Sequence, residues 1–174
     1  MKIRFLAFAP ALLFASALCA QPATITAHAD LTDASGKSVG QATLKETSGG
    51  VQIKATLSDL PPGTHAMHIH TVGKCDPPGF TTAGGHFNPD MKKHGMNNPD
   101  GMHAGDLPNF VVGADGKAKV SILAAHVTLK DGDHSLFHEG GTALVIHEKA
   151  DDYVTDPTGN AGARIACGVI EKEN

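Results

Sequence analysis

The motif His68-Ile69-His70 opens the part of the sequence whose residue types could carry chemistry. If residues 66–70 form a strand, residues two apart point to the same side, so both imidazoles project together. Two imidazoles so placed could hold one metal ion, because histidine is the commonest metal-binding side chain. The motif is short and frequent by chance, and alone it is weak evidence.

A second group of metal-binding residue types lies in a following segment rich in Gly, Pro and Asn. His86, His94, His103 and Asp106 are separated by intervals of eight, nine and three residues. Three imidazoles and one carboxylate form a suitable tetrahedral set for zinc. The alternative is a solvated polar loop, which does not explain three imidazoles in a segment with few core residues. His147 ends an apolar run, where a lone histidine is weak evidence for metal binding. It becomes a candidate ligand only together with these two groups.

Short apolar or alternating segments predict the strands that must position these residues. The predicted strands cover residues 23–31, 39–45, 51–57, 65–70, 109–112, 119–123, 142–147 and 164–171. No stretch has a helical period. Eight short strands with frequent turns indicate an all-β fold, an eight-stranded antiparallel Greek-key β-sandwich or flattened barrel.

Two segments do not fit as strands, the stretches 71–107 and 148–163. Irregular segments of this length in a compact domain are usually functional or disordered. The first contains the three histidines of the zinc-type set, and a bound metal would hold it in place. We therefore expect a metal loop over about 71–107 and an active-site loop over about 148–163 of a single domain.

The first twenty residues have the features of a cleaved secretory signal. Lys2 and Arg4 precede an apolar run, and Ala20 is a plausible cleavage position. The expected mature domain covers 21–174, exported to the periplasm. Lipidation at Cys19 is the minor alternative, because Leu18 is bulkier than the residue such sites prefer.

Composition limits the partners of the mature chain. Removal of residues 1–20 takes away two bases and no acid, so the formal net charge of −4 becomes −6. This charge argues against nucleic acid or an acidic membrane as the main partner. No other segment is apolar enough for stable membrane insertion.

The cysteines of the mature chain predict one disulfide. Cleavage of the signal leaves Cys75 and Cys167, and two cysteines in an oxidising compartment usually pair. Two buried free thiols are the alternative.

Six motifs follow one another in order over essentially the whole mature chain. They are His68-Ile69-His70, Gly85-His86-Phe87-Asn88-Pro89, His94-Gly95, His103-Ala104-Gly105-Asp106-Leu107, His147-Glu148-Lys149-Ala150-Asp151-Asp152 and the run from Gly159-Asn160-Ala161-Gly162 through Arg164 to Cys167-Gly168-Val169-Ile170. In this order they resemble the motifs of the copper/zinc superoxide dismutase family. The short cysteine loop after the first motif and the signal peptide resemble the bacterial periplasmic branch of that family.

The resemblance implies one copper and one zinc ion per subunit, with one imidazole shared between them, and dismutation of superoxide to O2 and hydrogen peroxide. Asp151 would be the carboxylate behind a ligand of each metal, and Cys75–Cys167 the disulfide. Arg164 would bind superoxide beside copper, and His86 would also deliver a proton. The implied copper ligands are His68, His70, His86 and His147, and the implied zinc ligands are His86, His94, His103 and Asp106.

Two functions other than catalysis are possible for an exported metal-binding chain. A copper or zinc buffer would lack a redox ligand or Arg164, and neither is missing. A metal-delivery protein with an inactive domain usually loses ligands and adds a separate cysteine-bearing metal module, which this sequence lacks. The sequence leaves open a homodimer. It also leaves open whether Lys92, Lys93 or Lys149 steer the anionic substrate, since solvated surface lysines explain them as well.

Overall fold

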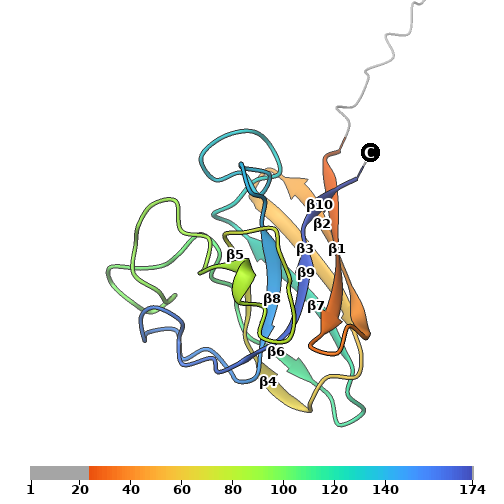
Figure 1. Ribbon diagram of the computed structural model, residues 1–174. Helices are drawn as coiled ribbons and strands as arrows, with labels where there is room; N and C mark the ends of the chain where they lie inside the picture. The colour runs from red at the N-terminus through yellow and green to blue at the C-terminus, as the bar shows by residue number, and fades with distance from the viewer. Residues whose placement is uncertain (1–23, 174) are drawn as a thin grey trace, which may run out of the picture.

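The computed structural model describes residues 24–173 (Figure 1). The predicted signal peptide, residues 1–20, lies outside them. The described part contains ten strands and one 3-10 turn, so the predicted all-β fold is confirmed. These elements are β1 (Thr26–Asp33), β2 (Ser38–Thr47), β3 (Gly50–Leu57), β4 (Gly63–His65), β5 (Met67–His70), η1 (Thr81–Ala83), β6 (Phe110–Val112), β7 (Ala118–Ala124), β8 (Ala143–His147), β9 (Arg164–Val169) and β10 (Glu171–Lys172).

The strands form one large antiparallel sheet and one small one. In the large sheet the order is β5-β8-β9-β1-β2-β3-β7, with β10 also paired to β1, and β4 pairs with β6 separately. The first strand therefore lies beside β9, near the end of the chain, while β2 and β3 form a hairpin closed by Ser48 and Gly49. The large sheet is strongly curled (Figure 1), as expected for a flattened barrel.

Alternation of apolar and polar residues explains most of the barrel wall. In β7, Ala118, Val120, Ile122 and Ala124 are buried while the residues between them are exposed. The same period appears in β2 and β3, because successive side chains of a strand point to opposite faces. The buried set forms one continuous hydrophobic core.

Strands β5 and β8 differ from the others because every one of their residues is buried. Leu144 and Ile146 belong to the barrel core, whereas Ala143 and Val145 pack with Phe80 in a second cluster outside it. The outer faces of these strands are thus covered by the long loops, which gather on one side of the sheet (Figure 1). This arrangement creates a buried layer between the barrel wall and the loops.

The prediction of one strand over 65–70 is wrong in one respect. The chain changes sheets at Ala66, so that β4 pairs with β6 and β5 pairs with β8. The Ala66 N–H donates to the Lys149 carbonyl at 2.8 Å, and the Ala66 carbonyl accepts from the His147 N–H at 2.9 Å. The change of partner cannot be seen in the local pattern, because both halves have strand-like composition.

Within residues 24–173, no helix has the length and apolar character needed to cross a bilayer.

Glu46 of β2 anchors the loop between β7 and β8. Its carboxylate accepts hydrogen bonds from the Leu129 N–H at 2.7 Å and from the Thr128 hydroxyl, and lies 3.3 Å from the Lys130 ammonium. Burial opposes ionisation, but these donors outweigh it and hold the pKa of Glu46 below its ordinary value of 4.5. The stability that this shift contributes is therefore present above about pH 4.5 and lost as pH falls through the lowered pKa.

We expect Glu46→Ala to lower the free energy of unfolding at pH 7 by about 2 kcal/mol, because it leaves the Leu129 N–H without its charged acceptor. Urea unfolding followed by circular dichroism measures this loss. Lys130→Ala is the control, and should cost less than about 1 kcal/mol because that side chain is 61% exposed. Equal losses in the two variants would contradict the assigned role of the carboxylate.

Candidate metal centre

The first set of histidines is assembled by the pairing of β5 with β8. His68 and His70 lie on the same face of β5, and the antiparallel register places Val145 opposite His68. His147 ends β8 on the same side. His86 lies in the long loop, whose main chain pairs with that of His70 in an isolated antiparallel β-bridge. Nitrogen atoms of these four buried residues all lie within 4.8 Å of one another, and Nε2 of His70 is 3.4 Å from Nε2 of His147.

The second set lies entirely in the long loop. Oδ1 of Asp106 is 2.9 Å from Nδ1 of His86, 3.0 Å from Nδ1 of His94 and 3.4 Å from Nδ1 of His103. The other oxygen of Asp106 accepts the N–H groups of Gly95 and His103. The carboxylate is therefore fixed by main-chain donors, with one oxygen left to face three imidazoles.

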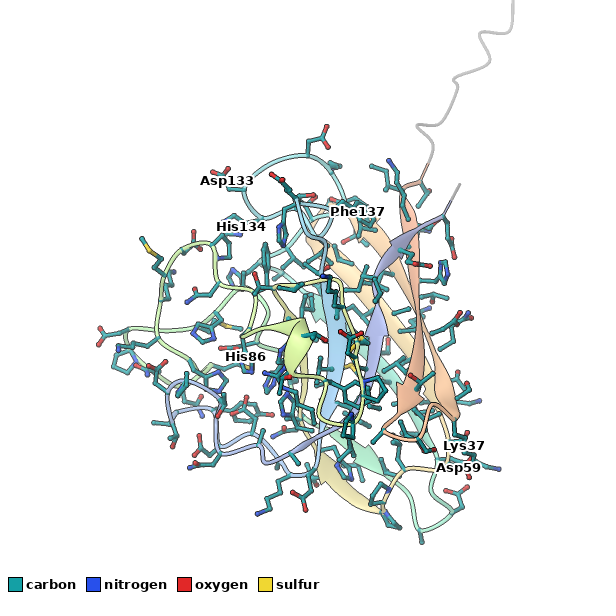
Figure 2. The ribbon with its side chains drawn as sticks, in the orientation of Figure 1. Lys37, Asp59, His86, Asp133, His134 and Phe137 are labelled. Atoms are coloured by element: carbon teal, nitrogen blue, oxygen red, sulfur yellow. A yellow bond between two sulfur atoms is a disulfide. The ribbon has the colours of Figure 1, made fainter. Side chains whose placement is uncertain are left out.

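His86 belongs to both sets. Its Nδ1 faces Asp106, while its Nε2 is buried and has no hydrogen-bond partner in the described protein. Nδ1 of His68 is likewise buried without a partner. Buried polar atoms in folded proteins are almost always satisfied, so two such nitrogens facing the same group of imidazoles fit a bound cation. Figure 2 shows His86 inside the molecule, between the sheet and the loops.

Charge states favour metal binding at most of these positions. Burial lowers the pKa of His70 to about 2, and lowers the pKa values of His86 and His147 to about 4 each. These imidazoles are thus neutral at pH 7, as a ligand must be. For His94, burial is outweighed by hydrogen bonds to Asp106 and Asp151, and its pKa is raised to about 9.

Asp151 connects the two sets from behind. Its Oδ2 is 2.8 Å from Nε2 of His68, and its Oδ1 is 3.0 Å from Nε2 of His94. Each ring therefore presents its other nitrogen, Nδ1, to its own set. Gly159 has a φ of 63° and lies against this contact, where a Cβ would overlap Asp151. Only glycine combines that backbone conformation with that proximity.

Arg164 lies beside the first set, held by main-chain carbonyls. Its guanidinium donates to the Phe80 and Gly84 carbonyls at 2.6 Å each. The Gly84 carbonyl also lies 2.9 Å from Nδ1 of His70, so one acceptor positions both the arginine and a candidate ligand. Arg164 is half-buried, which leaves part of the cation available to an anion from solvent.

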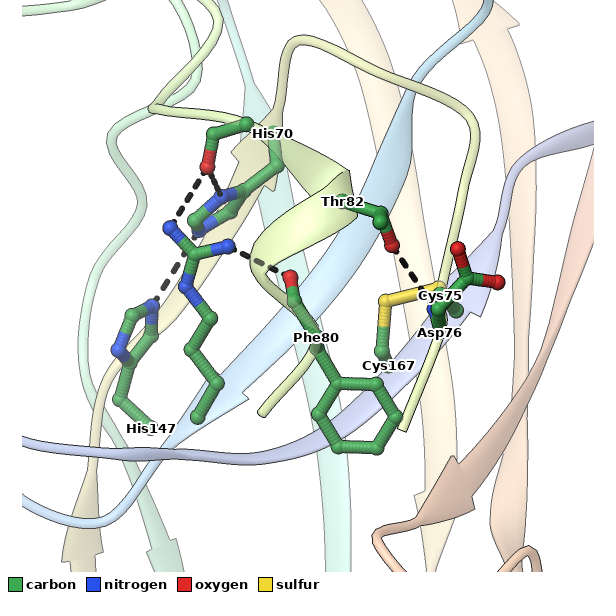
Figure 3. The surroundings of a disulfide bond; sticks show 9 residues. His70, Cys75, Asp76, Phe80, Thr82, His147 and Cys167 are labelled. Carbon is green, nitrogen blue, oxygen red and sulfur yellow. Dashed lines mark hydrogen bonds between the residues drawn. A yellow bond between two sulfur atoms is a disulfide. The ribbon is translucent and has the colours of Figure 1, made fainter. Parts of the chain in front are cut away.

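The predicted disulfide between Cys75 and Cys167 is present. It ties the loop that carries Phe80 to β9, the strand that begins at Arg164. Figure 3 shows the disulfide on one side of Phe80 and the imidazoles of His70 and His147 on the other. The covalent link thus holds the loop segment whose carbonyls position the guanidinium.

Two polar residues near the centre were missed by the sequence analysis. Buried His65 places Nδ1 2.8 Å from the carbonyl of His147, and Nε2 2.8 Å from the carbonyl of Pro61. Asn109 exchanges hydrogen bonds with the main chain of Asp151. No sequence signal identifies them, because the partners that link them to the centre, His147 and Asp151, lie more than 40 residues away in the chain.

The lysines considered for substrate steering are placed at the surface. Lys92 is exposed, and so is Lys149. The Lys93 ammonium lies 3.4 Å from the carboxylate of Asp156, so its charge is partly compensated. A role of any of them in steering stays a prediction.

The structure is an antiparallel barrel that carries two buried, adjoining sets on its outer wall, one of histidines and one of histidines with an aspartate, and each set could hold a metal ion. A model of the copper/zinc superoxide dismutase family matches residues 38–170. The chain therefore belongs to the copper/zinc superoxide dismutase family, and the predicted family and enzyme class are confirmed.

Individual relatives agree with this assignment. The chain is 56% identical over 146 residues to superoxide dismutase [Cu-Zn] 1 of Aquifex aeolicus (strain VF5), covering 83% of this chain and 86% of that one. It is 47% identical over 150 residues to a superoxide dismutase-like protein of Bacillus subtilis (strain 168), covering 84% and 76%.

Solved structures match the fold over most of their length. A double mutant of a SOD-like protein from Bacillus subtilis superposes with a TM-score of 0.80 at 50% identity, covering 82% of this chain and 95% of that chain. The Cu/Zn superoxide dismutase from Brucella abortus gives a TM-score of 0.70 at 32% identity, covering 84% and 99%.

Proposed function

We propose that this protein dismutes superoxide at a site holding one copper and one zinc ion per chain. The copper ligands would be His68, His70, His86 and His147, and the zinc ligands His86, His94, His103 and Asp106. The observation that carries the proposal is the position of His86, which directs Nδ1 to Asp106 and a buried, unpartnered Nε2 toward the other set. The family membership of the chain supports the choice of metals.

The overall reaction consumes two superoxide anions and two protons and yields one O2 and one hydrogen peroxide. When bound, copper would supply the one-electron redox chemistry, and zinc, which is redox-inert, would organise the loop. His86 would carry a proton at Nε2 when that nitrogen is not serving as a ligand, and would donate it to the substrate, because Nδ1 faces Asp106 of the zinc set. One proton of each product peroxide would come from this imidazole and the other from water.

Arg164 would bind the anionic substrate beside the copper set. Its two donors to Phe80 and Gly84 fix the guanidinium plane next to His70, so the cation needs no rearrangement when superoxide arrives. A fixed positive charge near the site matters because the mature chain has a formal net charge of −6 if residues 1–20 are removed. At physiological salt, charges are screened over roughly 8 Å, so a local cation outweighs a distant surplus of acids.

Asp151 would set the orientation of one ligand on each side. By accepting hydrogen bonds from Nε2 of His68 and Nε2 of His94, it leaves Nδ1 of each ring free for a metal. Such partners raise ligand basicity and fix the tautomer, and their loss typically lowers metal affinity by about 10–100-fold.

Residues 1–20 would be a cleaved export signal, and 21–174 the mature periplasmic domain. The basic start and apolar run of the signal support this location, as does the disulfide, which forms in oxidising compartments. N-terminal sequencing of the protein recovered from a periplasmic fraction tests both the location and the cleavage position. Size-exclusion chromatography with light scattering tests for a homodimer.

Metal analysis of the purified protein, together with a dismutation assay, tests the proposed function directly. We expect one copper and one zinc per chain, and an activity that is lost on chelation and restored only when copper is returned. Zinc alone should restore no activity, which makes it the matched control. Full loading with both metals in the absence of dismutation would instead assign the chain to metal storage or delivery.

A further inference from the structure

Tyr153 occupies an unusual position beside the metal centre. It is the single tyrosine of the sequence, which contains no tryptophan. It follows Asp151 by two residues, is half-buried, and has a φ of 64°, a left-handed conformation that non-glycine residues seldom adopt. Strained backbone of this kind persists only where the surrounding contacts determine it.

The main chain of Tyr153 contacts both the active-site loop and the metal loop. Its N–H donates to Oδ1 of Asp151 at 2.6 Å, and its carbonyl accepts the Asn97 N–H at 3.0 Å. Gly95, with a φ of 110°, packs so closely that a Cβ would overlap this carbonyl. Tyr153 is thus fixed against the segment that directly follows the candidate zinc ligand His94.

The phenol of Tyr153 extends the same connection to the start of β6. Its oxygen accepts the N–H of Asn109 at 2.7 Å. Asn109 in turn donates from Nδ2 to the Asp151 carbonyl, and accepts the Asp151 N–H at Oδ1, both at 2.9 Å. Asp151 is therefore held on its side chain by the N–H of Tyr153, and on its main chain by the asparagine that the phenol fixes.

We propose that Tyr153 is a positioning residue that aligns Asp151, and through it the orientation of His68 and His94. The inference rests on the proposed metal assignment, and it gives the zinc-side loop a physical connection to a copper ligand. The phenol oxygen is the specific element, because phenylalanine would fill the same space while leaving the Asn109 N–H without an acceptor. The asparagine could then shift, and with it the main chain of Asp151.

Comparison of Tyr153→Phe with the wild type at 25 °C tests this role, and Val154→Ala is the matched control. Val154 is the next residue and is 51% exposed, so its truncation should change nothing measured. We expect zinc to leave the zinc-loaded Tyr153→Phe protein about 3–10-fold faster in excess chromogenic chelator, somewhat less than the effect of removing a direct partner of a ligand. We also expect an altered electron paramagnetic resonance spectrum of Cu(II) in the copper- and zinc-loaded variant.

If the phenol only stabilised the fold, the folded Tyr153→Phe variant would release zinc at the wild-type rate and would keep the wild-type Cu(II) spectrum. Wild-type zinc release together with a wild-type Cu(II) spectrum would overturn the inference, even if the melting temperature fell. The proposed function fails differently, since the wild type would then bind no zinc or would bind both metals without dismutation.

Tyrosine fluorescence gives a second test that needs no variant. Because Tyr153 is the sole tyrosine and tryptophan is absent, emission near 300 nm reports on this residue alone. Titration of the metal-free wild type with zinc should change the emission in proportion to zinc uptake, because zinc bound at His94 would fix the segment that packs against Tyr153. Stoichiometric zinc uptake with constant emission would count against the connection.

Discussion

Replacing His147 by alanine should abolish dismutation while leaving zinc binding and the fold in place. His147 ends β8 and belongs only to the first set, so the loop-borne set of Asp106 keeps all its members. Loss of a partner behind a ligand already lowers metal affinity by about 10–100-fold, so loss of the ligand itself should lower copper affinity by at least about 100-fold. Copper and zinc content, measured beside activity, give the result.

The control for this variant is His126→Ala. The side chain of His126 is exposed and belongs to neither set, so both metals and full activity should remain. Circular dichroism establishes whether the His147→Ala barrel is intact. A folded His147→Ala protein that retains stoichiometric copper and wild-type activity would remove this residue from the proposed ligand set.

Loss of the disulfide is expected to have the largest effect on stability. Cys75 and Cys167 are separated by 92 residues, and the chain-entropy treatment assigns about 4–5 kcal/mol to a crosslink that closes so long a loop. Cys75→Ser should therefore lower the free energy of unfolding by several kcal/mol. It should also release the loop that carries Phe80, and with it one acceptor of the Arg164 guanidinium.

Equilibrium unfolding in urea, with zinc content held equal, measures the disulfide prediction. The wild type after reduction is the matched comparison, because it loses the same crosslink without a change of side chain. Agreement between the reduced wild type and Cys75→Ser assigns the effect to the bond. If the free energy of unfolding fell by less than about 1 kcal/mol in both proteins, residual structure would already restrict the unfolded chain without the disulfide, and the prediction would be wrong.

Two regularities of the sequence predicted part of the candidate ligand sets, and the family resemblance supplied the rest, namely His147 and the sharing of His86 by both sets. Alternation along strands placed His68 and His70 on one face before any partner strand was known. The small intervals between His86 and Asp106 allowed one loop to gather a full set. The structure brings all these residues together, and their role as ligands stays a prediction.

The residues that support the candidate ligands could not be predicted in the same way. Asn109 contacts the main chain of Asp151 across 42 residues, and His65 contacts the main chain of His147 across 82. A carbonyl or N–H group is common to every residue, so such contacts leave no trace in side-chain patterns. The division of the 65–70 segment between two sheets was missed because local composition does not specify which strand will be the neighbour.

The two sets differ in the sequence separation between their members. His86 and Asp106 are 20 residues apart, whereas His70 and His147 are 77 residues apart on different strands. Closing a short loop costs less entropy than closing a long one. The zinc-type set can thus assemble within a single contiguous stretch of the chain. The copper-type set can assemble only after β5 has paired with β8. On the proposed ligand assignment, copper would therefore bind only to chains in which β5 has already paired with β8.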